Sequence, residues 1–395
     1  MEYYLISAVK AALLMGFLLL TLLYLQWIER KVIAHVQVRI GPSRVGPHGL
    51  LQPVADSLKL LLKEDLIPPH VNKFLYLLAP FVAVTLSLLS FAVIPFGPEV
   101  EVLGVRTRMQ LADLDIAVLF VLAVSAMTVY AVVLAGWSSN SKYPLLGGLR
   151  SAAQMISYEL PLALAVAAPL LLANTLNLRE IVERQGGYYL GLLPRWNIVQ
   201  LPAPQLLGFL VFGVAMFAET NRIPFDLPEA ENELVAGFHA EYSAMKFAAF
   251  FMAEYANMIT VSAMATLLFL GGWHPLWPRE YGSDLLAPAL LAGVGALALY
   301  HGVNPARERD RRTLPAVAGG FFLLAAVFLL PPLREVLMPL FWFLGKVGLL
   351  LWVFMWVRGT LPRFRYDQLM RFAWGFLFPV AVVNLLATGL LVAVF

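Results

Sequence analysis

Ten long apolar segments decide most of what this chain can fold into. Each approaches the roughly 20 residues that a helix needs to cross the hydrocarbon core of a bilayer. Backbone groups inside a bilayer must find hydrogen bonds within the protein, so we expect every segment to be helical. The sequence thus predicts one all-α integral membrane domain over residues 1–395, a polytopic helix bundle. The segments cover residues 5–27, 75–95, 115–136, 155–175, 205–220, 247–270, 285–301, 314–331, 337–357 and 374–395.

The composition excludes several classes of function. Hydrophobic residues make up 60% of the chain and charged residues 13%, whereas soluble domains carry about 25% charged residues. The chain has no cysteine, which excludes disulfides and thiolate-held iron–sulfur clusters within it. The six histidines are dispersed, so no metal site is expected. A net charge of +3 is too small to indicate nucleic-acid binding.

Basic residues in the loops predict the orientation in the membrane. With ten helices the loops alternate between two sides, which hold 19 and 7 of the Lys and Arg residues. The richer side is cytoplasmic by the positive-inside rule, so both termini are expected outside. Lys10 and Lys346 fall within predicted helices. Lys10 lies near enough to a helix end to reach the interface, whereas Lys346 is about nine residues into its helix.

The first cytoplasmic loop contains the sequence QVRIGPSRVGPHG, residues 37–49. Two Gly-Pro pairs predict a rigid, irregular loop. Apolar residues then recur at helical spacing, which predicts an amphipathic helix along the membrane surface up to residue 63 or 64. Residues 37–64 are either a simple membrane anchor or the frame of an opening through which a lipid-soluble substrate enters.

Acidic residues are concentrated in residues 219–243, which hold six of the 25 in the chain. Asp226 and Glu229 have the spacing of a capping box, so they predict a short helix that runs to Gly237. Glu229 and Glu233 share a face of that helix, and like charges at this spacing repel. An exposed acidic loop on the cytoplasmic side remains the simpler alternative.

Three further glutamates lie within predicted membrane helices, near their cytoplasmic ends: Glu159, Glu219 and Glu254. Each costs roughly 2.5–3.5 kcal/mol on insertion scales, and such residues usually face a bundle interior or a water-filled path. Burial and neighbouring carboxylates favour the protonated form of an acid, so these groups are suited to exchange protons near neutral pH. The pattern indicates either a proton relay or a cation path from the cytoplasmic face.

Several segments resemble one known family. The stretch ETNRIPFDLPEAENELVAGFHAEYS closely resembles the signature loop of the H-type membrane subunits of NADH-quinone oxidoreductase, or complex I. The other matching segments follow in the order of the family. They are ERKVIAHVQVRIGPSRVGPHGLLQPVADSLKLLLKED (29–65), GWSSNSKYPLLGGLRSAAQMISYEL (136–160), FMAEY (251–255), LFLGGW (268–273) and RYDQLMRFAWGFLFP (365–379).

The resemblance implies a subunit at the junction of the hydrophilic and membrane arms of a proton-translocating enzyme. It implies that the chain forms part of the quinone chamber and couples quinone reduction to proton translocation. The expected substrate is quinone, with no redox cofactor bound by this chain and with FMN and iron–sulfur clusters in partner subunits. The expected partners are quinone-site subunits of the peripheral arm and antiporter-like and small subunits of the membrane arm. The expected location is the bacterial cell inner membrane.

The resemblance also implies two sets of site residues and no catalytic residue. Quinone binding is expected of Glu29, Arg30, Gln37, Arg39, Arg44, Asp56, Phe225 and Asp226. The proton relay is expected to use Glu159, Glu219, Glu254, Glu229, Glu231, Glu233 and Glu241, with residues 219–246 as an acidic cytoplasmic loop.

Two departures from the family pattern matter. Some members carry a glutamate where this chain has Ala126, so the relay cannot depend on an acid there. Residues 285–331 add two apolar segments around the basic sequence NPARERDRRTLP, which predicts an inserted transmembrane hairpin.

The main alternative function is the ion-translocating membrane subunit of an energy-converting hydrogenase. The PFDLPEAE and RYDQ sequences favour the quinone enzyme.

Overall fold

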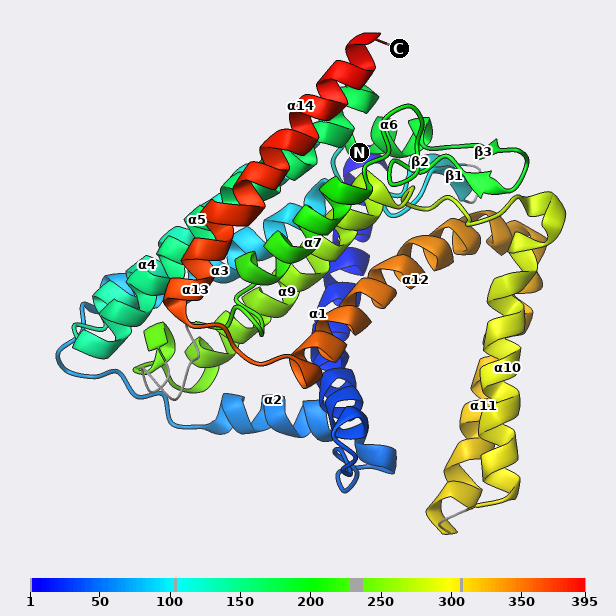
Figure 1. Cartoon of the computed structure of the whole chain (residues 1–395). Helices are drawn as coiled ribbons and strands as arrows, with labels where there is room; N and C mark the ends of the chain where they lie inside the picture. The colour runs from blue at the N-terminus through cyan, green and yellow to red at the C-terminus, as the bar shows by residue number, and fades with distance from the viewer. Residues whose placement is uncertain (1, 103–104, 228–236, 306–307, 395) are drawn as a thin grey trace.

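The computed structural model describes residues 2–102, 105–227, 237–305 and 308–394. Within these residues, nine helices are long and apolar enough to cross a membrane, and Leu206–Glu219 is a shorter apolar helix. Each of the ten apolar segments is therefore helical. The prediction of an all-α membrane bundle is confirmed, with two small antiparallel β-hairpins added outside the long helices (Figure 1).

The elements follow one another in a simple order. The helices are α1 (Glu2–Val36), α2 (Gln52–Leu62), α3 (Lys73–Leu89), α4 (Ala117–Ser138), α5 (Lys142–Ala173), α6 (Leu178–Arg184), α7 (Leu206–Glu219), α9 (Ala244–Phe269), α10 (Ser283–Val303), α11 (Glu308–Leu329), α12 (Pro331–Thr360), α13 (Tyr366–Phe372) and α14 (Phe378–Val394). The strands are β1 (Glu99–Val102), β2 (Val105–Arg108), β3 (Tyr188–Tyr189) and β4 (Leu193–Pro194). Short turns of 3₁₀-helix include η1 (Pro47–Gly49) and η3 (Gly237–His239).

Two membrane helices extend well past their apolar segments. Helix α1 continues to Val36 although its apolar segment ends at residue 27, and α5 begins at Lys142 although its apolar segment begins at residue 155. Close packing stabilises the early part of α5, because a Cβ on Gly147 would lie 2.8 Å from the Cα of Gly237. Hydropathy does not register such contacts, so the predicted cytoplasmic loops were too long at these two places.

The predicted surface helix is present as α2, which lies across the end of α1 (Figure 1). Its apolar face is open on the outside of the protein, where Leu58, Leu61 and Leu62 are 52–84% exposed. Such a face suits the boundary between headgroups and acyl chains. The preceding residues 37–49 form an irregular loop apart from the short turn η1, as the Gly-Pro pairs predicted.

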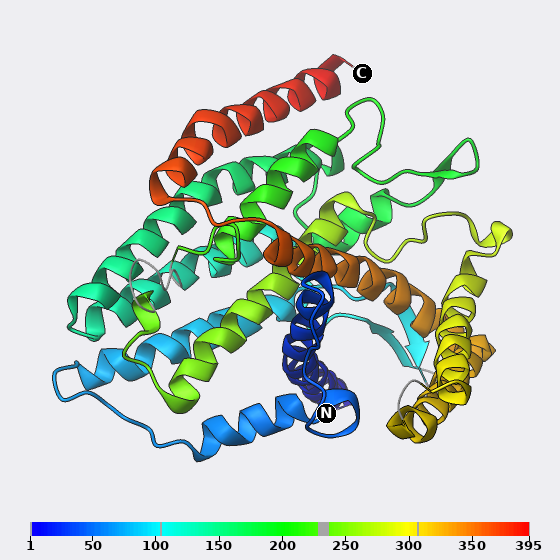
Figure 2. The same ribbon diagram turned by 60° about the horizontal axis from the view of Figure 1, so that its bottom comes forward.

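Helix α9 lies at the centre of the protein. All of its residues from Met258 to Phe269 are buried, and it contacts α1, α3, α7 and α12. Helices α3, α4, α5, α7 and α14 form the bundle on one side of α9, and α1 and α12 cross on the other (Figures 1 and 2). Side chains on α9 can therefore reach both parts of the molecule.

Helices α10 and α11 form an antiparallel pair that stands apart from the main bundle (Figures 1 and 2). The pair is attached to α12 by a small apolar cluster of Ala287, Phe328 and Met338. It occupies most of residues 285–331, where an inserted hairpin is predicted, and its insertion relative to the family stays a prediction.

The two ends of the described chain lie at the same end of the bundle (Figure 1). The loop after α1, the C-terminal end of α10 and the N-terminal end of α11 lie at the opposite end. This arrangement agrees with an even number of crossings. Which end faces the cytoplasm stays a prediction.

Candidate functional site

An apolar cavity of about 470 Å³ lies between α1, α2 and α9. We call it the membrane cavity. Leu22 of α1, Leu60 of α2 and Phe251 of α9 are among its apolar lining residues, and Arg30, Asp56 and Tyr255 add polar groups. An apolar volume with a few polar groups suits an apolar ligand that carries a polar head.

The ion pair of Arg30 and Asp56 fixes α2 against α1. The Arg30 Nη1 to Asp56 Oδ2 distance is 2.6 Å, and the Gln52 side-chain amide donates to Asp56 Oδ1 at 2.9 Å. Two of the residues predicted to bind quinone, Arg30 and Asp56, are thus brought together at the wall of the membrane cavity. The role of residues 37–64 as the frame of an opening stays a prediction.

A second, wider cavity of about 650 Å³ lies inside the 37–49 loop, and we call it the loop cavity. Arg30, Arg39 and Arg44 line it together with residues 40–43. Arg30 therefore borders both cavities. Gln37 is exposed and accepts a hydrogen bond from Arg39 Nε at 2.8 Å, so it orients that arginine.

A buried group of charges lies beside the membrane cavity, and we call it the Glu29 cluster. Glu29 is 2% exposed and forms ion pairs with Arg222, at 3.4 Å, and with Arg358. The hydroxyl of Tyr255 also donates to Glu29. A buried carboxylate is strongly destabilising unless it is paired and hydrogen-bonded, and this one is both.

Arg222 extends the cluster toward the bundle interior. Its Nη2 lies 3.8 Å from Glu254 Oε2, and its guanidinium lies 4.3 Å from the centre of the Tyr255 ring. One guanidinium therefore bridges two carboxylates from different helices, Glu29 of α1 and Glu254 of α9.

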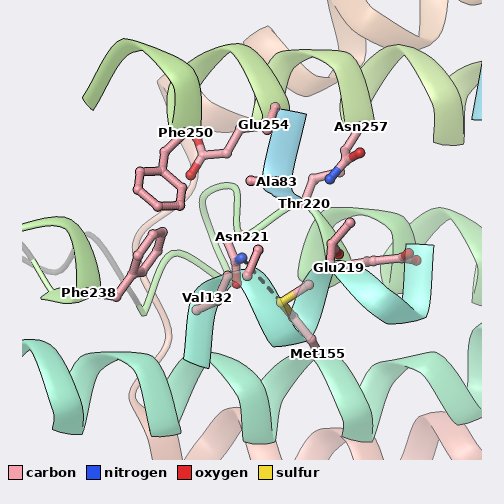
Figure 3. Close-up of a pocket in the computed structure, with 13 residues that line it drawn as sticks. Ala83, Val132, Met155, Glu219, Thr220, Asn221, Phe238, Phe250, Glu254 and Asn257 are labelled. Atoms are coloured by element: carbon pink, nitrogen blue, oxygen red, sulfur yellow. Dashed lines mark hydrogen bonds between the residues drawn. The ribbon is translucent and has the colours of Figure 1, made fainter. Parts of the chain in front are cut away.

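Glu254 also lines a small inner cavity of about 40 Å³. Figure 3 shows Glu254 and Asn257 extending from α9 toward the segment that carries Thr220 and Asn221. Glu219, at the end of α7, lines the same cavity. A cavity needs a volume of about 10–15 Å³ and several polar partners to hold a water molecule. The inner cavity is larger than this and has polar side chains in its wall, so it can hold ordered water.

Glu219 is partly buried. One of its oxygens is hydrogen-bonded with the hydroxyl of Ser125 on α4, and Glu159 of α5 is close enough to act on it electrostatically. The other oxygen, Oε2, has no hydrogen-bond partner among the described residues. Buried polar atoms without a protein partner commonly bind water, so Glu219 is suited to exchange a proton with water in the inner cavity.

The other predicted relay residues are less informative. Glu229, Glu231 and Glu233 lie outside the described residues, as do the predicted capping box and short helix. Glu241 is described but does not line the inner cavity. Its backbone carbonyl accepts a hydrogen bond from the Tyr76 hydroxyl at 2.7 Å.

Phe225 and Asp226 hold the loop after α7 in place. Phe225 packs against the ring of Tyr158 at 5.3 Å, and its carbonyl accepts from the Gln154 side chain at 2.7 Å. Asp226 is paired with Arg363 at 2.9 Å. Neither residue lines the membrane cavity or the loop cavity, and their contact with quinone stays a prediction.

Lys346 has a role that sequence reasoning missed. Its ammonium donates to the carbonyl oxygens of Leu270, Gly272 and His274 at 2.6–2.9 Å. It also lies 4.1 Å from the ring centre of Trp196. Burial and the nearby Lys346 lower the pKa of His274 to about 4, so the imidazole is neutral at pH 7. Lys346 thus fixes α12 to the chain that leaves α9.

Sequence reasoning also missed Arg358, Tyr255 and the pairing of Arg222 with Glu29 and Glu254. Tyr255 directly follows Glu254, and Arg222 lies within the acid-rich stretch, so both were near a recognised signal. Arg358 follows an apolar segment and resembles any basic residue at a helix end. Its partner Glu29 is 329 residues away in the sequence.

Comparison with known proteins identifies a family for this chain. A family model described as NADH dehydrogenase matches residues 9–389. A protein of Solibacter usitatus, named as an H subunit of NADH-quinone oxidoreductase, is 66% identical over 389 residues, covering 98% of this chain and 97% of the relative. The H subunit from Koribacter versatilis is 45% identical over 402 residues, covering 99% of this chain and 98% of the relative. The H subunit from Frankia casuarinae is 46% identical over 380 residues, with 96% and 71% covered.

Proposed function

The chain belongs to the NADH dehydrogenase family, and from this we propose that it is the H-type membrane subunit of an NADH-quinone oxidoreductase, or complex I. It is an integral membrane protein that contributes to the quinone chamber and couples quinone reduction to proton translocation. The hydrogenase alternative is not favoured, because these relatives are named as subunits of the quinone enzyme.

One observation carries the coupling role: hydrogen bonds, ion pairs and a shared cavity lead in series from the membrane cavity to the partly buried acids. Tyr255 lines the membrane cavity and donates to Glu29. Arg222 joins Glu29 to Glu254, and Glu254 shares the inner cavity with Glu219. Glu159 lies next in line, beside Glu219. A charge change at the membrane cavity can therefore act on groups that hold or exchange protons.

The quinone is proposed to enter through the membrane cavity. Its apolar tail fits the leucine-lined part, and its polar head suits Arg30 and Tyr255. Arg39 and Arg44 of the loop cavity add donors for the quinone oxygens. FMN and iron–sulfur clusters would belong to partner subunits, since this chain has no cysteine for a cluster.

Reduction of a quinone to a quinol takes up two electrons and two protons. Negative charge that reaches the head before its protons competes with Glu29 and Glu254 for Arg222, which lies 3.4 Å and 3.8 Å from them. A shift of Arg222 changes how strongly Glu254 is held as a carboxylate. The neighbouring Glu219 and Glu159 then pass protons along the helices.

The orientation and location form part of the proposal. The 37–49 loop and the end of α7 that carries Glu219 face the cytoplasm, with both termini outside, in a bacterial inner membrane. Glu159 and Glu254 lie near the middle of α5 and α9, deeper than the sequence predicted. The excess of basic residues on one side supports this orientation. The peripheral-arm subunits then bind the cytoplasmic face.

The test uses Glu219→Gln and Glu254→Gln in the assembled complex, which remove the ionisable group with little change of shape. We expect NADH-driven quinone reduction and proton pumping to fall together by at least 10-fold. Oxidation of NADH by a soluble electron acceptor should be unchanged, because it does not need this subunit. Glu183→Gln is the matched control, because that side chain is 55% exposed on α6. Wild-type pumping and quinone reduction in both variants would overturn the relay.

A further inference from the structure

The α10–α11 pair contacts the rest of the protein at both of its ends. At its base, Arg334 of α12 binds Asp284 at 2.8 Å, beside the apolar cluster around Met338. At its far end, Thr313 of α11 reaches the 37–49 loop. The Thr313 Oγ1 to His48 Nε2 distance is 3.0 Å, between residues 265 positions apart.

The pair is closely packed along its length. Gly295 and Gly302 of α10 face α11, and Cβ atoms there would lie 3.2 Å from Phe322 and 2.7 Å from Pro315. Small residues let membrane helices approach closely, which favours van der Waals packing over their whole contact. The α10–α11 pair is therefore expected to move as one rigid arm rather than as two separate helices.

The loop that Thr313 contacts has an unusual backbone. His48 has φ 52° and ψ 20°, the left-handed conformation, and the flanking Gly46 and Gly49 have φ 71° and 79°. A side chain other than glycine adopts this conformation at an energetic cost, so contacts around it must stabilise it. The hydrogen bond to Thr313 is one such contact.

The restraint on His48 is passed on to the wall of the loop cavity. A Cβ on Gly49 would lie 2.3 Å from the carbonyl oxygen of Pro42, so the end of the loop is in direct contact with its middle. Pro42 lines the loop cavity together with Arg39 and Arg44. A displacement of His48 therefore moves the segment that holds these arginines.

We infer that the α10–α11 pair is a strut that positions the quinone-entrance loop, with Thr313 and His48 as positioning residues for quinone access. This inference rests on the proposed function of the 37–49 loop. It assigns a role to the two helices that lie outside the main bundle.

The first test compares Thr313→Val, which removes the hydroxyl at nearly constant volume, with Thr313→Ser, which keeps it. In the assembled complex, Thr313→Val should raise the KM for quinone by about 3- to 10-fold, the effect of losing one hydrogen bond, with kcat changed less than about 2-fold. Thr313→Ser should stay near the wild type. Thr107→Val in β2 is the control for a threonine outside this contact.

The second test measures the loop without quinone. Because the chain has no cysteine, Val38→Cys, at a position 95% exposed in the loop, accepts a single spin label on the full chain in lipid nanodiscs. Thr313→Val should increase the mobility of the label, and Thr313→Ser should not. Unchanged mobility in Thr313→Val would overturn the strut.

The variant Arg39→Ala separates this inference from the proposed function. If Arg39→Ala raises the KM for quinone but Thr313→Val does not, the positioning role is wrong and the quinone role of the loop stands. If label mobility rises in Thr313→Val while neither variant changes the KM, the strut exists and the proposed quinone role of the loop is wrong.

Discussion

Replacing Glu29 with glutamine tests how the Glu29 cluster is held together. Glu29 and Glu254 balance Arg222 and Arg358, so the four side chains carry no net charge. Glu29→Gln leaves one excess positive charge. Arg222, which is 6% exposed, cannot recover its hydration without unfolding.

The size of the effect follows from the geometry. Two unit charges 3.4 Å apart interact by about 5 kcal/mol at an effective dielectric constant of about 20. Removing one partner of a buried ion pair lowers the stability of a protein by about 3–5 kcal/mol. We therefore expect Glu29→Gln to lower the free energy of unfolding by about 3–5 kcal/mol.

A second variant makes the test specific for charge balance. Arg358→Gln alone should lower the free energy of unfolding by less than Glu29→Gln does, because the Arg358 side chain is 31% exposed. The double variant Glu29→Gln/Arg358→Gln restores zero net charge and leaves Arg222 beside Glu254. It should be more stable than the sum of the two single effects predicts, by about 1–3 kcal/mol.

The assay is denaturation of the full chain in mixed micelles, followed by helical circular dichroism. Asp367→Asn is the control, since it removes a carboxylate that is 60% exposed and paired with Arg365, and its effect should stay within about 0.5 kcal/mol. Strictly additive effects of Glu29→Gln and Arg358→Gln would refute the argument, because additivity means that the two groups do not share a charge balance.

Two further predictions concern the loop that follows α9. Lys346→Met removes the ammonium that donates to three carbonyl oxygens. It should lower the midpoint of thermal unfolding far more than Lys10→Met, because Lys10 is partly exposed and donates only to the carbonyl of Arg108. Equal shifts in the two variants would show that the carbonyl contacts of Lys346 contribute little. His274 has a pKa of about 4 in the folded protein against 6.5 for the free side chain. Between these two pH values the unfolded chain binds a proton on His274 that the folded protein does not bind. Stability should therefore fall as the pH falls from about 6.5 to about 4. In His274→Gln this part of the pH dependence should be absent from denaturation curves, and an unchanged slope would assign it to other groups.

The sequence predicted the features that depend on local pattern. The ten helical segments follow from hydropathy, α2 from the spacing of its leucines, and the irregular 37–49 loop from its Gly-Pro pairs. Glu159, Glu219 and Glu254 were found because an ionisable group in an apolar segment is costly. The structure places Glu219 and Glu254 at one cavity.

The partners of these groups were not predictable in the same way. Arg222 and Arg358 approach Glu29 from 193 and 329 residues away, and no local pattern specifies which charges meet. Lys346 binds backbone carbonyls, which every residue has, so its partners leave no mark in the sequence. The extended start of α5 depends on close glycine contacts rather than on hydropathy.

The position of Lys346 gives α12 the mechanics of a lever. The helix has 30 residues, or about 45 Å, and Lys346 fixes it close to its midpoint. Met338, toward one end, joins the α10–α11 pair, and Arg358, near the other end, belongs to the Glu29 cluster. A tilt of α12 about this pivot would move its two ends in opposite directions, so a displacement of the α10–α11 pair at one end of α12 would reach the charges at the other end.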